Sequence, residues 1–243
     1  MVDATHDVPS SGMRISAIIP CHDGERYVAE AIRSALAQAR DPIEVIVVDD
    51  GSTDGTPAAV GAFGNAVRYE RVPHGGAAAA RNRGVELASG DAIAFLDADD
   101  LWTEGALPQL AAAMAADLSA GMALGRMEQF VSPELPETDR NRFQFSPDPV
   151  AARMCGTVLI RRTDFDRVGG FSPRLASGEF IDWYLRAEHA GVKAVTIPQV
   201  VLRRRLHHWN HGVTRRDTRQ DYLQVVKAAL DRRRSLEAGA NPS

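Results

Sequence analysis

The sequence has little cysteine and no cysteine motif. Its two cysteines, Cys21 and Cys155, are far apart and form no CxxC pair, which excludes the common zinc and redox motifs and argues against a disulfide framework. We expect both side chains to be reduced thiols, as is usual for a cytoplasmic protein.

A long apolar run is also missing. The most apolar stretch, residues 106–124, is interrupted by Pro108, Gln109 and Asp117, whereas a membrane span needs about 18 apolar residues or more. Residues 1–13 are polar and acidic without the apolar segment of an export signal, so we interpret them as a disordered lead-in. We expect no transmembrane segment and a cytoplasmic location, with peripheral contact at a membrane as the open alternative.

Negative charge is in excess over most of the chain. Residues 1–200 contain 18 Lys and Arg against 28 Asp and Glu, whereas residues 201–243 contain 10 against 4. An acidic body argues against binding to nucleic acid. Residues 213–243 form a predicted basic tail, with an amphipathic helix over residues 216–234 that packs on the body or on a second subunit. The alternative is a solvated helix face.

The remaining pattern predicts one α/β domain. The chain has 243 residues, of which 44% are hydrophobic and 25% charged, as in ordinary globular domains. Short apolar runs alternate with segments of helical spacing, which is typical of βαβ units and a mostly parallel, Rossmann-like sheet with flanking helices. The first half predicts strands at 15–19, 44–48, 67–72 and 92–96 and helices at 25–38 and 77–88. The second half predicts a helix at 101–116, a strand at 122–131, a loop at 132–150, a strand at 157–160, a helix at 178–190 and short strands at 193–197 and 200–205.

Polar clusters follow the first, second and fourth predicted strands, at residues 20–23, 49–52 and 97–100, where open α/β sheets bind ligands. The most informative is the run Asp97-Ala98-Asp99-Asp100, because three carboxylates in four residues repel one another at neutral pH. A Mg²⁺ or Mn²⁺ ion relieves that repulsion and prefers hard oxygen ligands. An acidic turn that caps the next helix is the alternative interpretation.

The second cluster is the run from Asp49 and Asp50 through Gly51 to Thr56. A carboxylate just beyond a strand can accept hydrogen bonds from a base N–H or a ribose hydroxyl. A turn with a helix cap explains the residues from Gly51 onward but leaves two adjacent acids unexplained.

The third cluster runs from His74-Gly75-Gly76 to Arg81 and Asn82. It lacks the GxGxxG dinucleotide fingerprint. Its glycines open a predicted helix, on which Arg81 and Asn82 either reach donor groups or lie on the surface.

The order and spacing of these stretches resemble the family 2 glycosyltransferases, which have the GT-A fold. The resemblance is tight over residues 14–102 and looser to residue 212, and it rests on Ile15–Pro20 with His22-Asp23-Gly24-Glu25, Val48–Thr56, Ala80–Gly84 with Ala88–Asp91, and Leu96–Asp100. It implies a single GT-A domain over residues 14–212, with a nucleotide-sugar half (14–102) and an acceptor half (103–212). The family usually has Tyr-Asn-Gly where this chain has His22-Asp23-Gly24.

The resemblance also implies roles. Pro20, His22 and Asp50 would line the nucleobase and ribose, and Asp97 and Asp99 would hold the ribose and the metal-bound diphosphate. The donor would be a nucleotide-diphosphate sugar, and the transfer would invert the anomeric centre. The acceptor is not indicated: a surface polysaccharide, a lipid-linked intermediate, and a modified peptide or small molecule all fit.

The second half supplies two further motifs. Arg203 to Asn210 resembles the family's Arg-x-His segment, which places His207 at the metal or diphosphate and Arg205 or Arg204 beside the leaving nucleotide. The run beginning Gly178-Glu179-Phe180 resembles the family's Glu-Asp helix start, but Phe180 replaces the usual catalytic Asp.

A general base must therefore come from a neighbouring acid. We rank Glu179 first and Asp182 second, because positions two apart on a helix point to different faces.

Two alternatives remain. A nucleotidyltransferase would carry a Gly-rich basic loop after the first strand, but here that loop, residues 21–25, is acidic. A catalytically impaired relative that only binds a nucleotide sugar is compatible with Phe180.

Overall fold

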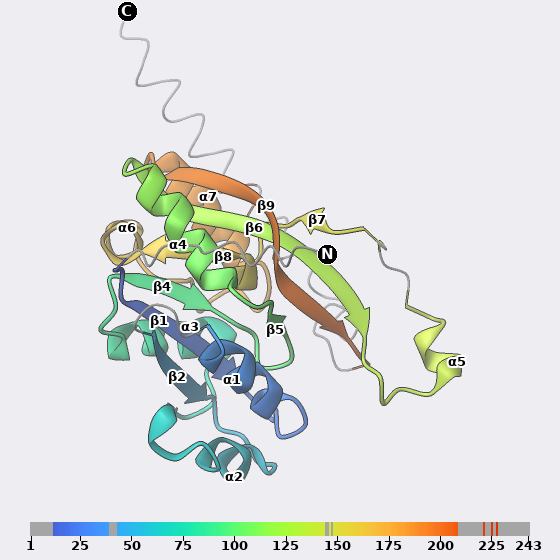
Figure 1. Ribbon diagram of the computed structural model, residues 1–243. Coiled ribbons are helices and arrows are strands. Elements are labelled where there is room, and N and C mark those ends of the chain that lie inside the picture. The colour runs from blue at the N-terminus through green and yellow to red at the C-terminus, as the bar shows by residue number, and fades with distance from the viewer. Residues whose placement is uncertain are drawn as a thin grey trace, which may run out of the picture.

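The computed structural model describes residues 12–38, 43–143, 146, 148–208, 221, 225 and 227, which form one α/β domain (Figure 1). Helices cover both faces of a continuous, curled sheet. In chain order the elements are β1 (Ile15–Cys21), α1 (Val28–Leu36), β2 (Ile43–Asp49), α2 (Thr56–Gly61), β3 (Arg68–Arg71), α3 (Ala77–Leu87), β4 (Ala92–Phe95), β5 (Leu101–Trp102), α4 (Ala106–Ala116), β6 (Ala120–Val131), α5 (Glu137–Arg140), β7 (Val150–Ala151), β8 (Val158–Arg161), α6 (Arg162–Val168), α7 (Glu179–His189) and β9 (Lys193–Leu206).

The sheet has the order β3-β2-β1-β4-β8-β6-β9-β5. The short strand β7 pairs antiparallel with β6. Strands β3, β2, β1 and β4 are parallel, which confirms the predicted βαβ units. Strand β8 then pairs antiparallel with both β4 and β6, and β9 runs parallel to β6. The carboxyl ends of β1, β2 and β4 consequently meet at one edge.

The core is divided by the sheet into two apolar layers. Alternate residues of β1 face opposite sides, so Ile15, Ala17 and Ile19 join one cluster and Ile18 joins the other. Helices α1 and α4 cover the first face, and α6 and α7 cover the second. Helix α3 packs on β1 and β2, where Gly84 brings its backbone against Ile18.

Several predicted elements differ from the structure, and the predicted loop over 132–150 contains the short helix α5. The predicted helix over 101–116 begins instead with strand β5, because Leu101 and Trp102 pair with β9, and α4 starts only at Ala106. The two predicted short strands at 193–197 and 200–205 form one strand, β9, whose pairing with β6 is irregular where Pro198 interrupts it. Proline has no N–H to donate, which explains the irregularity.

The ends of the chain are described only in part. Of the predicted lead-in, only Gly12 and Met13 are described, and most of the predicted helix over 216–234, including Tyr222, Leu223, Val226, Ala229 and Leu230, lies outside the described residues. Asp221 accepts hydrogen bonds from the backbone of Ala176 and Ser177, and Val225 is buried. Across the described part of the chain, no helix is both long and apolar enough to cross a membrane.

Candidate active site

The loops that follow β1 and β2 are tied together by reciprocal hydrogen bonds. The backbone N–H of Asp23 donates to Ser52 Oγ, while the N–H of Thr53 donates to Asp23 Oδ1 at 2.7 Å. Two residues after Asp23, Glu25 Oε2 accepts the N–H of Gly55 at 2.7 Å. Each loop thus satisfies the backbone of the other, and the two strand ends are held in a fixed relative position.

Asp50 orders the start of α3. Its side chain is buried, and its two carboxylate oxygens accept the N–H groups of Gly75 and Gly76 at 2.7 and 2.8 Å. Gly76 has φ +88°, a conformation that residues with a Cβ rarely adopt. The second and third polar clusters of the sequence are therefore in direct contact through Asp50.

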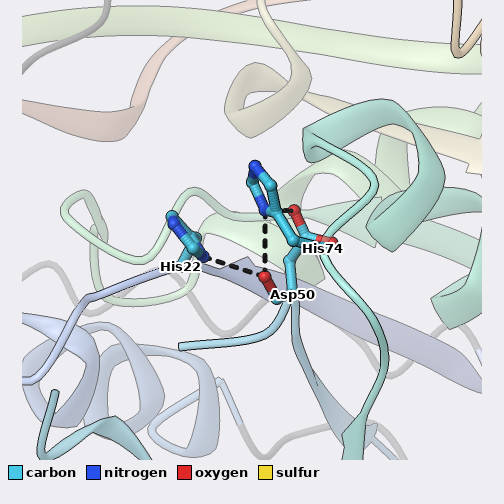
Figure 2. Close-up of side chains that lie close together, drawn as sticks. All are labelled: His22, Asp50 and His74. Carbon is cyan, nitrogen blue, oxygen red and sulfur yellow. Dashed lines mark hydrogen bonds and ion pairs between the residues drawn. The ribbon is translucent and has the colours of Figure 1, made fainter. Parts of the chain in front are cut away.

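Two imidazoles lie beside Asp50 (Figure 2). The rings of His22 and His74 stack with centroids 4.3 Å apart. Nδ1 of His22 lies 2.8 Å from the backbone oxygen of Asp50, and Nδ1 of His74 lies 2.9 Å from Asp50 Oδ2. His74 was not among the predicted site residues. The available signal was its position directly before the two glycines that bind Asp50.

Pro20 and Asp49, both predicted to line the donor, are buried beneath these loops. Pro20 lies opposite Val48 in the β1–β2 ladder. Asp49 accepts hydrogen bonds from Ser52 N at 2.8 Å and from the Tyr69 hydroxyl at 2.5 Å. Burial opposes the charge, but these hydrogen bonds outweigh it and lower the pKa of Asp49. A donor contact from Asp49 would have to replace one of these partners.

Arg81 bridges the two halves of the site. Its guanidinium is buried, and it lies 2.6 Å from Asp97 Oδ1 and 2.5 Å from Glu179 Oε1. Burial opposes a positive charge, but the neighbouring carboxylates outweigh it and raise the pKa of Arg81. Arg81, predicted as a donor contact or a surface residue, therefore holds the first Asp of the acidic run against the predicted base.

Asp99 faces a different partner. Its Oδ2 lies 2.9 Å from Nε2 of His207, which is buried beside the ring of Tyr27. Of the three predicted metal ligands, the structure thus brings Asp99 and His207 into contact, while the carboxylate of Asp97 is turned to Arg81.

Asp100 is the buried member of the acidic run. Its carboxylate is buried, and burial together with the charges of Asp99 and Asp97 raises its pKa well above the usual range. It accepts the backbone N–H of Arg205 at 2.8 Å. Clustered negative charge at this strand end, inferred from the sequence, is therefore a property of the folded site.

Arg205 holds the acidic loop in place. Its side chain is buried, its Nε donates to the backbone oxygen of Asp99, and its Nη2 lies 2.6 Å from Glu30 Oε2. The guanidinium lies 4.6 Å from the ring centroid of Tyr27. A contact between this guanidinium and a leaving nucleotide, as predicted, would require the pair with Glu30 to open.

Asp182, our second choice as base, is also engaged. Its Oδ2 accepts Arg186 Nε at 2.9 Å, and Arg186 in turn donates to the backbone oxygens of Val168 and Gly170. Phe180 is buried against Trp183 in the core beneath α7. Glu179 is therefore the acid of this helix start that faces the acidic loop.

Comparisons with known proteins agree with this geometry. Residues 16–176 match the model of the family described as Glycosyl transferase family 2.

Similar sequences include an uncharacterized glycosyltransferase of Rickettsia bellii, 43% identical over 90 residues, which are 36% of this chain and 13% of that protein. Glycosyltransferase GlyG of Streptococcus pneumoniae is 37% identical over 40% of this chain and 33% of its own length. The putative teichuronic acid biosynthesis glycosyltransferase TuaG of Bacillus subtilis is 36% identical over 38% of each. The alignments thus span 13% to 38% of these three relatives.

Two solved structures have a similar fold. S. aureus TarS 1–349 in complex with UDP-GlcNAc aligns over 90% of this chain and 66% of its own, with a TM-score of 0.71 and 21% identity. Mannosyltransferase PcManGT from Pyrobaculum calidifontis, in complex with GDP-Man and Mn²⁺, aligns over 92% of this chain and 66% of its own, with a TM-score of 0.67 and 22% identity. At this level of identity the likeness confirms the predicted GT-A fold.

Proposed function

Because the chain belongs to glycosyl transferase family 2, we propose that it transfers a sugar from a nucleotide-diphosphate sugar to an acceptor hydroxyl, with a divalent metal ion and with inversion at the anomeric carbon. One observation carries the proposal. The carboxylates of Asp97 and Asp99 stand at the carboxyl end of β4, where Asp97 is paired with Arg81 of helix α3 and Asp99 with His207, which is 108 residues away along the chain.

The residues at this strand end fit a hard divalent cation. Asp99 and His207 offer a carboxylate and an imidazole in contact with each other, and Asp97, which is paired with Arg81, would turn to complete a donor set compatible with Mn²⁺ or Mg²⁺. Burial and, after it, the charges of Asp99 and Asp97 raise the pKa of Asp100, and an ion at this strand end would relieve the repulsion between these charges. When bound, the ion would neutralise the diphosphate of the donor and of the leaving nucleotide.

We assign the general base to Glu179. A base must be held within reach of the acceptor proton, and Arg81 fixes the Glu179 carboxylate beside Asp97. The side chain of Glu179 is 15% exposed, so one edge of it is accessible. Asp182 is tied to Arg186 instead, and we assign it the role of stabilising the start of α7.

One observation favours a second candidate, a chain that binds a nucleotide sugar without turning it over. Phe180 occupies the position at which the resembling family usually carries its catalytic Asp, and its ring is buried in the core. Such a chain would bind donor and metal but release no nucleotide.

The test is a thermal-shift panel of nucleotide sugars with and without Mn²⁺, followed by an assay for nucleotide release. UDP-GlcNAc and GDP-Man begin the panel, because they occur in complexes of the similar structures. A donor at about 100 times its Kd stabilises the fold by ~2.7 kcal/mol. Metal-dependent binding followed by nucleotide release supports the transferase. Binding without release over hours supports the second candidate, and no stabilisation by any donor contradicts both.

A further inference from the structure

We propose that His22, Asp50 and His74 form a second metal site, which takes a transition-metal ion of the Zn²⁺ type. Each of the three can offer one ligand atom, and these atoms all lie within 4.8 Å of one another. The three residues come from three separate loops, after β1, after β2 and before α3, and they converge at the same edge of the sheet (Figure 2). None of them belongs to the Asp97, Asp99 and His207 set.

The candidate ligand atoms lie close together but do not yet share one centre. The Nδ1 of His74 lies 2.9 Å from Asp50 Oδ2, whereas the Nδ1 of His22 lies 2.8 Å from the backbone oxygen of Asp50 and would turn from it to an ion at the carboxylate. Bonds of about 2.0–2.2 Å to a tetrahedral ion place ligand atoms about 3.4 Å apart. The side chains of His22 and His74 are 42% and 60% exposed, so both have room to make this small adjustment. Asp50 is buried and serves as the fixed ligand.

The surroundings provide the second layer of hydrogen bonds that metal sites require. Gly75 and Gly76 hold the carboxylate of Asp50 through their N–H groups. When Nδ1 of His22 binds an ion, its Nε2 carries the proton, and Asp23 Oδ2 lies 3.6 Å from that atom. The Asp23 carboxylate is itself held by the N–H of Thr53. A bound ion would thus be followed by the imidazole of His22 and then by the carboxylate of Asp23.

The donor set selects a different ion from that of the proposed catalytic site. Two imidazoles and one carboxylate suit Zn²⁺, Co²⁺ or Ni²⁺, whereas carboxylate oxygens predominate around Asp97 and Asp99 and suit Mg²⁺ or Mn²⁺. Because three protein ligands leave a fourth position open, the exposed side of the ion would carry water or an added ligand.

The position of the site gives it a consequence for donor binding, which rests on the proposed function. The resemblance of this chain to its family places His22 and Asp50 at the nucleobase and ribose. An ion held by these residues would occupy the same place as the base. We therefore infer that Zn²⁺ competes with the nucleotide sugar and lowers its apparent affinity.

Direct Zn²⁺ binding to the purified chain tests the site without any assay of transfer. Calorimetric titration in excess Mg²⁺ is expected to show one saturable Zn²⁺ site in the parent protein. The variants His22→Ala and His74→Ala are each expected to bind Zn²⁺ at least ~10-fold more weakly, since even the loss of an outer hydrogen-bond partner commonly costs 10- to 100-fold. The matched control is His189→Ala, which removes an exposed histidine at the end of α7 and is expected to bind Zn²⁺ as the parent does.

Three outcomes would overturn the site: no saturable Zn²⁺ binding, parent-like binding in both His22→Ala and His74→Ala, or loss of the binding in His207→Ala instead. Circular dichroism verifies that each variant is folded, and His74→Gln, which keeps a polar side chain, serves as a second variant. Donor-competitive inhibition by Zn²⁺ that is weakened in His74→Ala would support the regulatory consequence. Zn²⁺ binding by a chain that shows no transfer with any donor would leave the metal site standing and contradict the proposed function alone.

Discussion

Nη1 of Arg81 lies 2.5 Å from Oε1 of Glu179, although the two residues are 98 positions apart in the sequence. The same guanidinium contacts Asp97 through its other terminal nitrogen. Arg81 therefore connects the acidic strand end to the helix start that carries the proposed base, and its side chain is buried between them.

Replacement of Arg81 by Met is expected to reduce both stability and activity. Removal of the guanidinium leaves Glu179 without its ion-pair partner, at a cost of about 1–3 kcal/mol, because that carboxylate is largely shielded from water. Denaturant unfolding and kcat measure the two effects. The matched control is Arg83→Met, which removes an exposed arginine of the same helix that pairs with Glu70 and Glu86 and is expected to cost less than ~1 kcal/mol. Equal stability of the two variants would contradict the proposed bridge.

Glu179→Gln is expected to lower kcat by about 10²- to 10⁴-fold at saturating donor and acceptor, since it removes the proposed general base. Asp182→Asn is expected to lower kcat far less and to lower the unfolding temperature instead, because it weakens the pair with Arg186. Comparison of kcat and thermal unfolding for the two variants separates the roles. A large loss of kcat in Asp182→Asn alone would assign the base to Asp182. Unchanged kcat in both variants would exclude both residues as the base.

Asp99→Asn is expected to abolish metal-dependent transfer and to leave the fold intact, because the side chain is partly exposed. His207→Ala is expected to lower kcat by about 10²-fold, the usual effect of losing one stabilising group at developing charge. Titration of activity with Mn²⁺ is the measurement, and Asp91→Asn, at the exposed pair with Arg14, is the control. Full activity of Asp99→Asn in the presence of EDTA would refute metal dependence.

Asp49 is expected to make stability depend on pH in the acid range. Its pKa is lowered in the folded protein, so the folded state binds fewer protons than the unfolded state, in which Asp has a pKa of about 3.9. The contribution is fully present above about pH 5 and is lost as the pH falls through the folded pKa. The gap in unfolding free energy between the parent and Asp49→Asn is therefore expected to shrink from pH 5 downward. A gap that is constant over this range would refute the prediction.

The sequence predicts the parts of the fold that depend on local patterns. The apolar runs at 15–19, 44–48 and 92–96 are strands β1, β2 and β4, because each run is short and bounded by polar turns, and the weaker segment at 67–72 is strand β3. Strand β5 was missed because Leu101 and Trp102 carry no periodic signal, and their conformation comes from pairing with β9.

In the site, too, local motifs can be predicted from the sequence, whereas contacts between residues far apart along the chain cannot. The acidic run with Asp97 and Asp99 is visible as a motif, and its contact with His207 is indicated by family resemblance. The contact between Arg81 and Glu179, and the stacking of His22 on His74, are not visible in the sequence. They depend on where the sheet places loops that are far apart along the chain.

The contacts of Arg205 bear on the order in which the chain acquires its site during synthesis. The loop after β4 receives a hydrogen bond from the backbone of Arg205 to Asp100, and another from its side chain to Asp99. The ribosome makes residue 205 about a hundred residues after this loop. A nascent chain that ends shortly after Trp102 can pair β1 to β4, but its acidic loop lacks both of these partners. The part of the domain up to Trp102 therefore completes its acidic loop only when the rest of the domain has been translated and β9 has docked beside it.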